Sequence, residues 1–279
     1  MSEHATRLVD TYGRGHRDMR VSLTDRCSLR CTYCMPADFA DWIPSAELLT
    51  TDELMNVLEV AIEEGIDEIR LTGGEPLLRP DAVDVVRRIN SLPRPPRVSI
   101  TTNGLRLAAQ AGALRDAGLE RVNISLDTLD RERFKKMTHR DRLDDVLAGL
   151  AAAKAAGLAP FKVNAVLMPG VNDDEAVPML RRALDEGWRL RFIEQMPLDA
   201  QGAWLRHEMV TAAEIHELLE SEFTLTAEEG RGSAPAEEFL VDGGPATVGI
   251  IASVSKPFCA ACDRLRLTAD GQIRNCLFA

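Results

Sequence analysis

Short runs in which hydrophobic and polar residues alternate recur along the chain, separated by stretches with helical periodicity. The runs cover residues 20–24, 68–72, 97–102, 121–126, 161–167 and 189–194. Alternation with a period of two is typical of β-strands. Strands joined through helices need crossover connections, which are right-handed and give a parallel sheet. The sequence therefore predicts an α/β fold built on six parallel strands.

Helical faces between these runs are marked by hydrophobic residues three and four positions apart. Leu54, Leu58 and Ile62 lie on the first such face. Thr50 and Glu53 precede it with the spacing of a capping box, so a helix is expected to begin there. Later faces contain Val85, Val86 and Ile89, then Leu143, Val146, Leu147 and Leu150, then Val177, Leu180 and Leu184. A further helix is predicted at 211–221.

The polar positions of the predicted strands are unusual, because parallel strands covered on both faces are normally continuous hydrophobic runs. Arg20 alternates with Val21, and Arg70 lies between Ile69 and Leu71. If the helices cover the apolar face, the polar face must line a shared interior. A closed eight-stranded barrel fills its interior with Val, Ile and Leu. We therefore predict an incomplete (βα)6 barrel that holds a large polar ligand. Ordinary alternation on an antiparallel sheet is the alternative.

The pattern changes beyond residue 225. An acidic stretch rich in Gly, Ala and Pro covers residues 227–238, and short β-like runs follow at 246–252, 265–268 and 272–274. We therefore predict two domains. Residues 1–225 are expected to form the partial barrel, and residues 226–279 a small α+β module.

Composition narrows the possible functions. The 279 residues are 45% hydrophobic and carry a net charge of −11, which disfavours electrostatic binding to nucleic acid. The first eighteen residues lack the apolar run of a secretory signal. No hydrophobic run approaches the ~20 residues of a membrane span. We expect a soluble, cytoplasmic protein with neither a nucleic acid nor a membrane as partner.

All six cysteines fall into two triplets near opposite ends of the chain. The triplets are Cys27, Cys31 and Cys34, and Cys259, Cys262 and Cys276. Disulfides are conceivable, but the cytoplasmic expectation and the odd number in each triplet favour metal binding. Three thiolates leave one iron of a [4Fe–4S] cubane without a protein ligand, so a cofactor or substrate can coordinate it. On spacing alone, a zinc ribbon missing one ligand explains the second triplet equally well.

The first triplet and a glycine pair after the second strand resemble the radical S-adenosylmethionine (SAM) superfamily. Cys27-x3-Cys31-x2-Cys34, with Tyr33 before the third cysteine, is similar to the superfamily signature. The Gly-Gly-Glu-Pro segment that includes Gly74 is similar to its second motif. The resemblance implies a [4Fe–4S] cluster whose open iron binds SAM, and cleavage of SAM to a 5′-deoxyadenosyl radical.

The second triplet and its surroundings resemble one family in this superfamily, the GTP 3′,8-cyclases (molybdenum cofactor biosynthesis protein A family). The segments 257–271 and 276–278 carry the likeness, together with 24–26, 35–36, 101–104 and 125–127. The resemblance implies conversion of GTP to a 3′,8-cyclised dihydro-GTP, the first step of molybdenum cofactor biosynthesis. The radical abstracts H3′, and the C3′ radical attacks C8 of guanine. The chemistry is carried by cluster and SAM, so no side chain is predicted to be catalytic.

Matching the family position by position also implies the binding residues. The SAM contacts would fall on Tyr33, Gly74, Ser125 and Met196. The GTP contacts would fall on Arg20, Arg70, Thr101, Lys162, Arg264, Leu265 and Arg266. The second triplet would hold a second [4Fe–4S] cluster whose open iron binds the guanine. Arg20, Arg70 and Lys162 also belong to the polar strand faces inferred above from alternation.

The resemblance further implies two partners, a reducing electron donor and a downstream pterin-forming enzyme. It also suggests a homodimeric assembly. Members of the family continue beyond the last cysteine to a Gly-Gly tail, whereas this chain ends at Ala279. The C-terminal module is therefore expected to be a truncated version. One alternative is another twin-cluster radical SAM enzyme, such as a peptide maturase. The other is a non-enzymatic iron–sulfur or zinc protein that binds a nucleotide or a partner.

Overall fold

The computed structural model of the chain describes residues 8–158, 161–198, 202 and 204–278. Its centre is a set of six parallel strands in chain order. They are β1 (Asp18–Ser22), β2 (Glu68–Thr72), β3 (Arg97–Thr102), β4 (Arg121–Ser125), β5 (Lys162–Leu167) and β6 (Arg189–Glu194). The predicted α/β fold is confirmed, and the antiparallel alternative is wrong.

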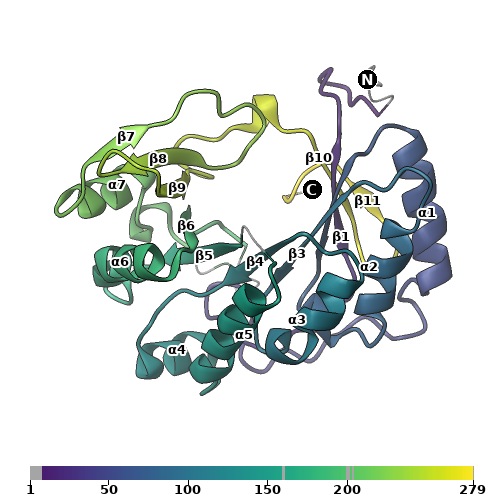
Figure 1. Ribbon diagram of the computed structural model, residues 1–279, viewed down its shortest axis with the longest axis horizontal. Coiled ribbons are helices and arrows are strands. Elements are labelled where there is room, and N and C mark those ends of the chain that lie inside the picture. The colour runs from purple at the N-terminus through teal and green to yellow at the C-terminus, as the bar shows by residue number, and fades with distance from the viewer. Residues whose placement is uncertain (1–7, 159–160, 199–201, 203, 279) are drawn as a thin grey trace.

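Helices cover the outer side of this curved sheet (Figure 1). They are α1 (Thr51–Glu63), α2 (Ala82–Asn90), α3 (Leu107–Asp116), α4 (Arg131–Thr138), α5 (Leu143–Ala155) and α6 (Ala176–Glu186). The capping box at the start of α1 is confirmed, since Glu53 N donates to Thr50 Oγ1 and Thr50 N donates to Glu53 Oε2. In the described part of the chain, no helix is long and apolar enough to cross a membrane.

The hydrophobic core lies between the helices and the sheet. Each central strand contributes alternate apolar residues to it, for example Val21, Leu71 and Ile100, which are fully buried. Their polar neighbours in sequence point to the opposite side of the sheet, because successive side chains of a strand alternate. The sheet thus separates an apolar outer layer from a polar interior.

The last quarter of the chain adds strands to both edges of the six-stranded sheet. At the β6 edge lie β9 (Thr247–Ile251), β8 (Glu237–Val241) and β7 (Leu225–Ala227), next to helix α7 (Ala212–Glu220). At the β1 edge lie β10 (Arg264–Leu267) and β11 (Ile273–Arg274). The β-like runs predicted here are present as β9, β10 and β11, yet they extend the central sheet instead of forming a separate one. The domain boundary at residue 225 stays a prediction.

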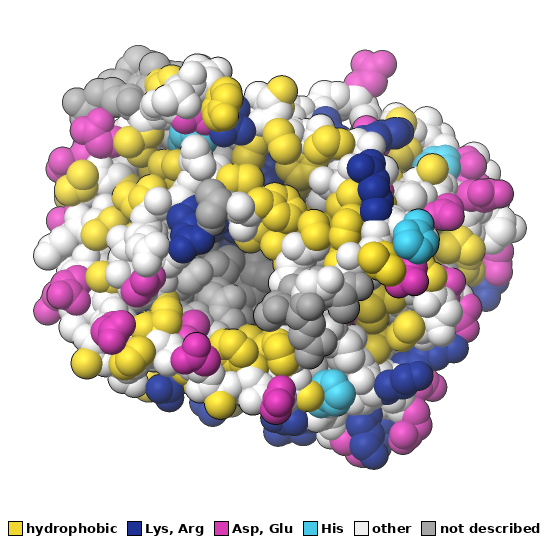
Figure 2. Space-filling model, turned by 180° about the vertical axis from the view of Figure 1, so that it is seen from behind, with side chains coloured by type: hydrophobic (Ala, Val, Ile, Leu, Met, Phe, Trp, Pro, Cys, Tyr) yellow, Lys and Arg dark blue, Asp and Glu magenta, His cyan; other side chains and the backbone are white. Residues whose placement is uncertain are grey.

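The face of the molecule seen from behind carries both signs of charge (Figure 2). Acidic and basic side chains intermingle around its periphery, and hydrophobic side chains gather nearer its centre. The charges on this face are therefore dispersed.

Candidate active site

The side of the sheet opposite the helices lines a cavity of about 360 Å³. Its lining includes polar residues from seven strands, namely Arg20, Arg70, Thr101, Ser125, Asn164, Arg191, Arg264 and Arg266. Each occupies an alternate position on its strand, on the face away from the apolar core. The polar interior predicted from alternation is therefore present and contains this cavity.

Three arginines of this lining lie side by side across adjacent parallel strands. Arg266 of β10 pairs in register with Arg20 of β1, which pairs in register with Arg70 of β2. Adjacent strands lie ~4.8 Å apart, so the three positive charges are close together. We call this set the arginine row.

The arginine row has too little negative charge around it. The Nε atoms of Arg20 and Arg70 are buried and have no hydrogen-bond partner among the described residues. The Asp18 carboxylate lies 4.0 Å from the Arg20 guanidinium. Burial, and secondly the charge of Arg70, lower the pKa of Arg20 to about 9. A guanidinium does not lose its proton in proteins, so the arginine row stays positively charged. An anionic ligand would offset the free-energy cost of burying these charges side by side.

Arg264 is held next to the row by neighbouring groups. Its Nη2 donates to the Ser233 carbonyl at 3.1 Å, and its guanidinium lies over the Phe258 ring, 4.9 Å from the centroid. The guanidinium of Arg231 also lies over Phe258, at 4.8 Å. The nearest carboxylate contact of Arg264, with Asp263, is 4.0 Å long. Arg264 is thus oriented by a carbonyl and a ring, and its charge remains available to an anion.

Two residues expected to contact GTP do not line the cavity with their side chains. Lys162 lies on the same face of β5 as Asn164, at the start of the strand, and is partly buried. Burial, followed by the charge of Arg191, lowers the pKa of Lys162 to about 8. The side chain of Leu265 points the other way and belongs to the hydrophobic core. The other five, Arg20, Arg70, Thr101, Arg264 and Arg266, are brought together.

The first cysteine triplet lies in the loop after β1, against the glycine pair at the end of β2. Gly74 N donates to the Thr24 carbonyl at 2.8 Å, and Glu75 N donates to the Arg26 carbonyl at 2.7 Å. A Cβ atom at Gly74 would lie 2.3 Å from the Arg26 carbonyl oxygen, so only glycine allows this approach. The end of β2 therefore fixes the segment that leads into Cys27.

The donor set of this loop fits an iron–sulfur cluster. Cys27, Cys31 and Cys34 are free thiols, and burial raises the pKa of each. Among the described residues, no three His, Cys, Asp or Glu side chains form a group able to hold a metal ion. A [4Fe–4S] cubane does not need three thiolates around one metal ion, because each thiolate binds a different iron. Three thiols in one loop suit a [4Fe–4S] cluster with one open iron.

Three of the four residues expected to contact SAM line the cavity. They are Tyr33, Ser125 and Met196, while Gly74 packs against the cysteine loop outside it. The Tyr33 hydroxyl donates to Asp127 Oδ2 at 2.8 Å, and Val166 N donates to Asp127 Oδ1 at 2.9 Å. Burial raises the pKa of Asp127 to about 6. Asp127 thereby links the cysteine loop to β5.

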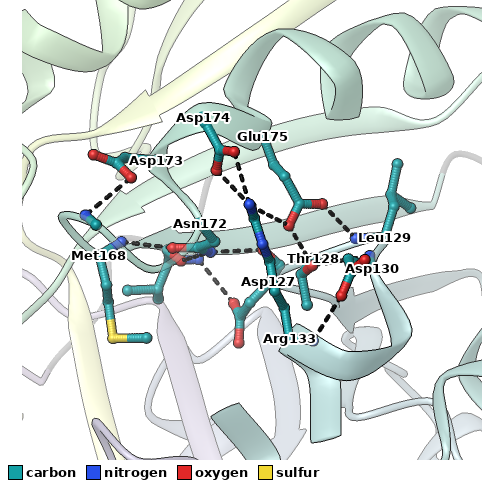
Figure 3. Close-up of polar contacts among 12 residues, drawn as sticks. Asp127, Thr128, Leu129, Asp130, Arg133, Met168, Asn172, Asp173, Asp174 and Glu175 are labelled. Carbon is teal, nitrogen blue, oxygen red and sulfur yellow. Dashed lines mark hydrogen bonds and ion pairs between the residues drawn. The ribbon is translucent and has the colours of Figure 1, made fainter. Parts of the chain in front are cut away.

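The loop after β4 that carries Asp127 is cross-linked to the segment after β5 (Figure 3). The fully buried Asn172 donates to the carbonyls of Asp127 and Val166, at 2.7 and 2.9 Å, and accepts from Met168 N at 2.7 Å. Glu175 accepts from Leu129 N at 2.8 Å. These bonds hold the loop of Asp127 at a fixed position beside the cavity.

The second cysteine triplet lines the same cavity through Cys259, Cys262 and Cys276. Cys262 lies two residues before β10, and the antiparallel pairing of β10 with β11 returns the chain so that Cys276 lies beside the start of β10. The segment that leads to Cys259 is anchored by Glu194, whose fully buried carboxylate accepts from Val254 N and Ser255 N, both at 2.8 Å. All three cysteines thus line one cavity, and their role as ligands of a second cluster stays a prediction.

The cavity also contains residues that sequence analysis did not assign to a ligand, among them Arg14, Asp127, Asn164 and Arg191. Asn164 and Arg191 lie on the polar strand faces, and Asp127 belongs to a segment that carries the family likeness. A signal was therefore present for these three. Arg14 lies outside every strand, and nothing in the local sequence indicates its position.

Comparisons with known proteins agree with this geometry. Residues 21–183 match the Radical SAM superfamily, and residues 188–279 match Molybdenum Cofactor Synthesis C. A curated protein from Streptomyces coelicolor named GTP 3′,8-cyclase is 60% identical, over 99% of this chain and 82% of its own. The chain belongs to the GTP 3′,8-cyclase family. A family member from Mycobacterium tuberculosis, GTP 3′,8-cyclase 2, is 54% identical over 98% of this chain and 77% of its own.

The radical SAM fold of the cyclase family is also found in distant solved structures. Streptococcus suis SuiB bound to S-adenosylmethionine superposes with a TM-score of 0.67 at 14% identity, over 95% of this chain and 59% of SuiB. HydG, a maturase of the [FeFe]-hydrogenase, superposes with a TM-score of 0.56 at 20% identity, over 74% of this chain and 49% of HydG. At such identity the likeness concerns the fold alone. Membership of the superfamily implies SAM and a [4Fe–4S] cluster.

Proposed function

We propose that this chain is a radical SAM enzyme that converts GTP to a 3′,8-cyclised dihydro-GTP, with SAM and two [4Fe–4S] clusters. One observation carries the proposal: a single cavity contains the arginine row, all three cysteines of the second triplet, and Tyr33 from the first cysteine loop. A substrate there would contact an anion site and a metal site at once, next to the SAM residues. A nucleoside triphosphate has both features required, a polyanion and a base with coordinating atoms.

The arginine row and Arg264 would bind the triphosphate. A guanidinium donates two parallel hydrogen bonds to phosphate oxygens, and Lys162 adds a point charge on the same sheet face. Thr101 lines the cavity and offers a hydroxyl. Cys259, Cys262 and Cys276 would hold the second cluster, whose open iron is suited to a guanine nitrogen or oxygen.

Tyr33, Gly74, Ser125 and Met196 would hold SAM beside the first cluster, whose ligands would be Cys27, Cys31 and Cys34. When bound, cluster and SAM supply the electron and the radical that abstracts hydrogen. The residues of the chain have the task of positioning and of excluding water. Asp127 contributes by fixing the Tyr33 hydroxyl at 2.8 Å. The proposal includes a reducing electron donor, a downstream pterin-forming enzyme, a homodimer and a cytoplasmic location, which rest on the family alone.

The proposed function is tested with anaerobically reconstituted protein, SAM and dithionite. We expect about eight irons per chain, the count for two cubanes. With GTP deuterated at C3′, we expect deuterium in the 5′-deoxyadenosine, because H3′ is the atom abstracted. Mass spectrometry of both products measures this. Cleavage of SAM without deuterium transfer from GTP would contradict the proposal, and stoichiometric zinc would contradict the second cluster.

Lys162→Met should weaken GTP binding by about 1–3 kcal/mol, the loss typical of a charged hydrogen bond. The pKa of Lys162 is lowered to about 8 by burial, so its ammonium form, which binds phosphate, disappears as pH rises through 8. Wild-type GTP affinity should therefore fall between pH 7 and 9, and that of the variant should not. Anaerobic calorimetry over this range measures both effects.

The matched control for this variant is Lys154→Met. Lys154 lies on α5 and pairs with Glu186 at the surface, so GTP affinity and its pH dependence should stay as in the wild type. An unchanged GTP affinity in Lys162→Met, together with a lowered melting temperature, would instead assign Lys162 to the stability of the fold.

A further inference from the structure

The described part of the N-terminal arm, residues 8–17, runs along the second cysteine segment before it enters β1. Arg17 N and Asp18 N both donate to the Asp263 carbonyl, at 3.0 and 3.3 Å. Arg14 Nη1 donates to the Cys259 carbonyl at 2.8 Å, which connects positions 245 apart in sequence. Arg14, Arg17 and Asp18 are therefore bonded to the backbone on both sides of Cys262.

Arg14 is a bridge between this segment and a carboxylate of the arm. Its Nε and Nη2 contact Asp10 Oδ2 at 2.7 and 2.6 Å, while Nη1 reaches Cys259. Asp10 is itself oriented, because its Oδ1 accepts from Tyr12 N and Arg14 N, at 2.9 and 3.0 Å. The side chains of Arg14 and Asp10 are only 19% and 8% exposed. The ion pair is thus partly buried and fixed by five bonds.

Arg14, the positively charged member of the pair, is the one that lies beside Cys259 and Cys262. Arg14 lines the cavity together with Cys259 and Cys262, and Asp10 does not. Hydrogen bonding to Arg14 lowers the pKa of Asp10 to about 2, so the carboxylate is ionised at neutral pH. Arg14 contacts no part of the first cysteine triplet in the hydrogen bonds described. Its charge therefore acts on one triplet.

We propose that Arg14 is a positioning residue of the second cluster, which fixes the Cys259 backbone and places a positive charge that raises the reduction potential of this cluster. The proposal rests on the proposed function, in which Cys259, Cys262 and Cys276 hold a [4Fe–4S] cluster. Reduction adds one electron from an external reductant, and a nearby cation stabilises the added negative charge. Substrate coordinated to this cluster would experience the same field.

Neutralising each member of the pair in turn gives a test that a structural role alone would not pass. Arg14→Gln removes the cation and leaves Asp10 with the His16 imidazole, 3.4 Å from Oδ2, as its remaining side-chain neighbour, so the potential of the second cluster should fall. Asp10→Asn removes the anion and leaves Arg14, so the potential should rise. We expect each shift to change the reduction equilibrium at least threefold, about 30 mV for one electron at 59 mV per tenfold. EPR-monitored redox titration of the reconstituted full chain measures it, with SAM added to shift the signal of the first cluster.

Arg17→Gln is the matched control. Arg17 lies on the same arm, but its guanidinium pairs with Asp67 and does not line the cavity, so both cluster potentials should stay at the wild-type value. Unchanged potentials in Arg14→Gln and Asp10→Asn, or shifts of both in one direction, overturn the proposal.

Failure of Arg14→Gln to load the second cluster is resolved by Arg14→Lys, which keeps the charge. A loaded Arg14→Lys protein with the wild-type potential supports the proposal, and one that also fails to load reduces Arg14 to a structural role and overturns it. Iron content of the wild type separates this inference from the proposed function. About four irons per chain would refute the second cluster itself, before any variant is made.

Discussion

Cys31→Ala should abolish reductive cleavage of SAM. The first triplet supplies three thiolates and no fourth, so the loss of one removes the cluster that must reduce SAM. The loop offers no replacement, because no other cysteine lies between Cys34 and Cys259. Iron content should fall from about eight to about four per chain. The measurement is 5′-deoxyadenosine formed with dithionite, by chromatography.

The control for this experiment is the mirror variant in the second triplet. Cys276→Ala should lose GTP turnover and about four irons, yet retain SAM binding and slow, uncoupled formation of 5′-deoxyadenosine. Comparison of the two variants shows which cluster cleaves SAM and which cluster is needed for GTP turnover. SAM cleavage at the wild-type rate in Cys31→Ala would show that the first triplet does not hold the reactive cluster.

The double variant Arg264→Ala, Arg266→Ala should remove GTP turnover while it spares SAM binding. Each guanidinium is expected to contribute about 1.5–3 kcal/mol through charged hydrogen bonds to phosphate. Together they correspond to a loss of about two to four orders of magnitude in GTP affinity. Neither residue touches the loop of Cys27, Cys31 and Cys34 in the contacts described, so SAM affinity should be unchanged. Binding of both ligands is measured anaerobically by calorimetry.

A spectroscopic result should accompany this loss. In the wild type, GTP but not ATP should perturb the EPR signal of the reduced second cluster, because guanine is the base expected at the open iron. The double variant should show no such change at the same GTP concentration. The matched control is Arg97→Ala with Arg121→Ala, two arginines that pair with Glu68 outside the cavity. GTP binding that survives in the double variant would leave Arg264 and Arg266 without their proposed role.

The six central strands could be predicted from sequence because hydrophobic and polar residues alternate within each of them. Val21 and Leu71 are fully buried between polar neighbours, and this contrast is visible in any short window. Helix α3 is not predicted, since four of its ten residues are alanine and there is little contrast between its faces. Strand β8 lies in a stretch of low hydrophobicity, where Glu237 and Glu238 are adjacent, and its pairing with β9 is what makes it a strand.

The candidate site was predictable where it depends on strand faces and motif spacing. Arg20 and Arg70 follow from alternation, and the two cysteine triplets follow from spacing. The attachment of β10 to β1 joins residues about as far apart as the chain allows, and no local pattern encodes it. The same attachment decides that Arg266 joins Arg20, and it brings Arg14 to Cys259. Contacts of this kind are set by the completed fold.

The parallel pairing of β10 with β1 also fixes a distance between the two cysteine triplets. Cys262 precedes the start of β10, whereas Cys27 follows the end of β1, and Asp18 is in register with Arg264. The two triplets therefore lie at opposite ends of one strand pair, with the four residue steps from Asp18 to Ser22 between them, about 13 Å at ~3.3 Å per step. GTP at the second triplet and SAM at the first must together span this length. Inserting residues between Cys34 and α1 should be tolerated far better than lengthening β1 and β10. Longer strands would separate the two triplets by a fixed increment for each residue added.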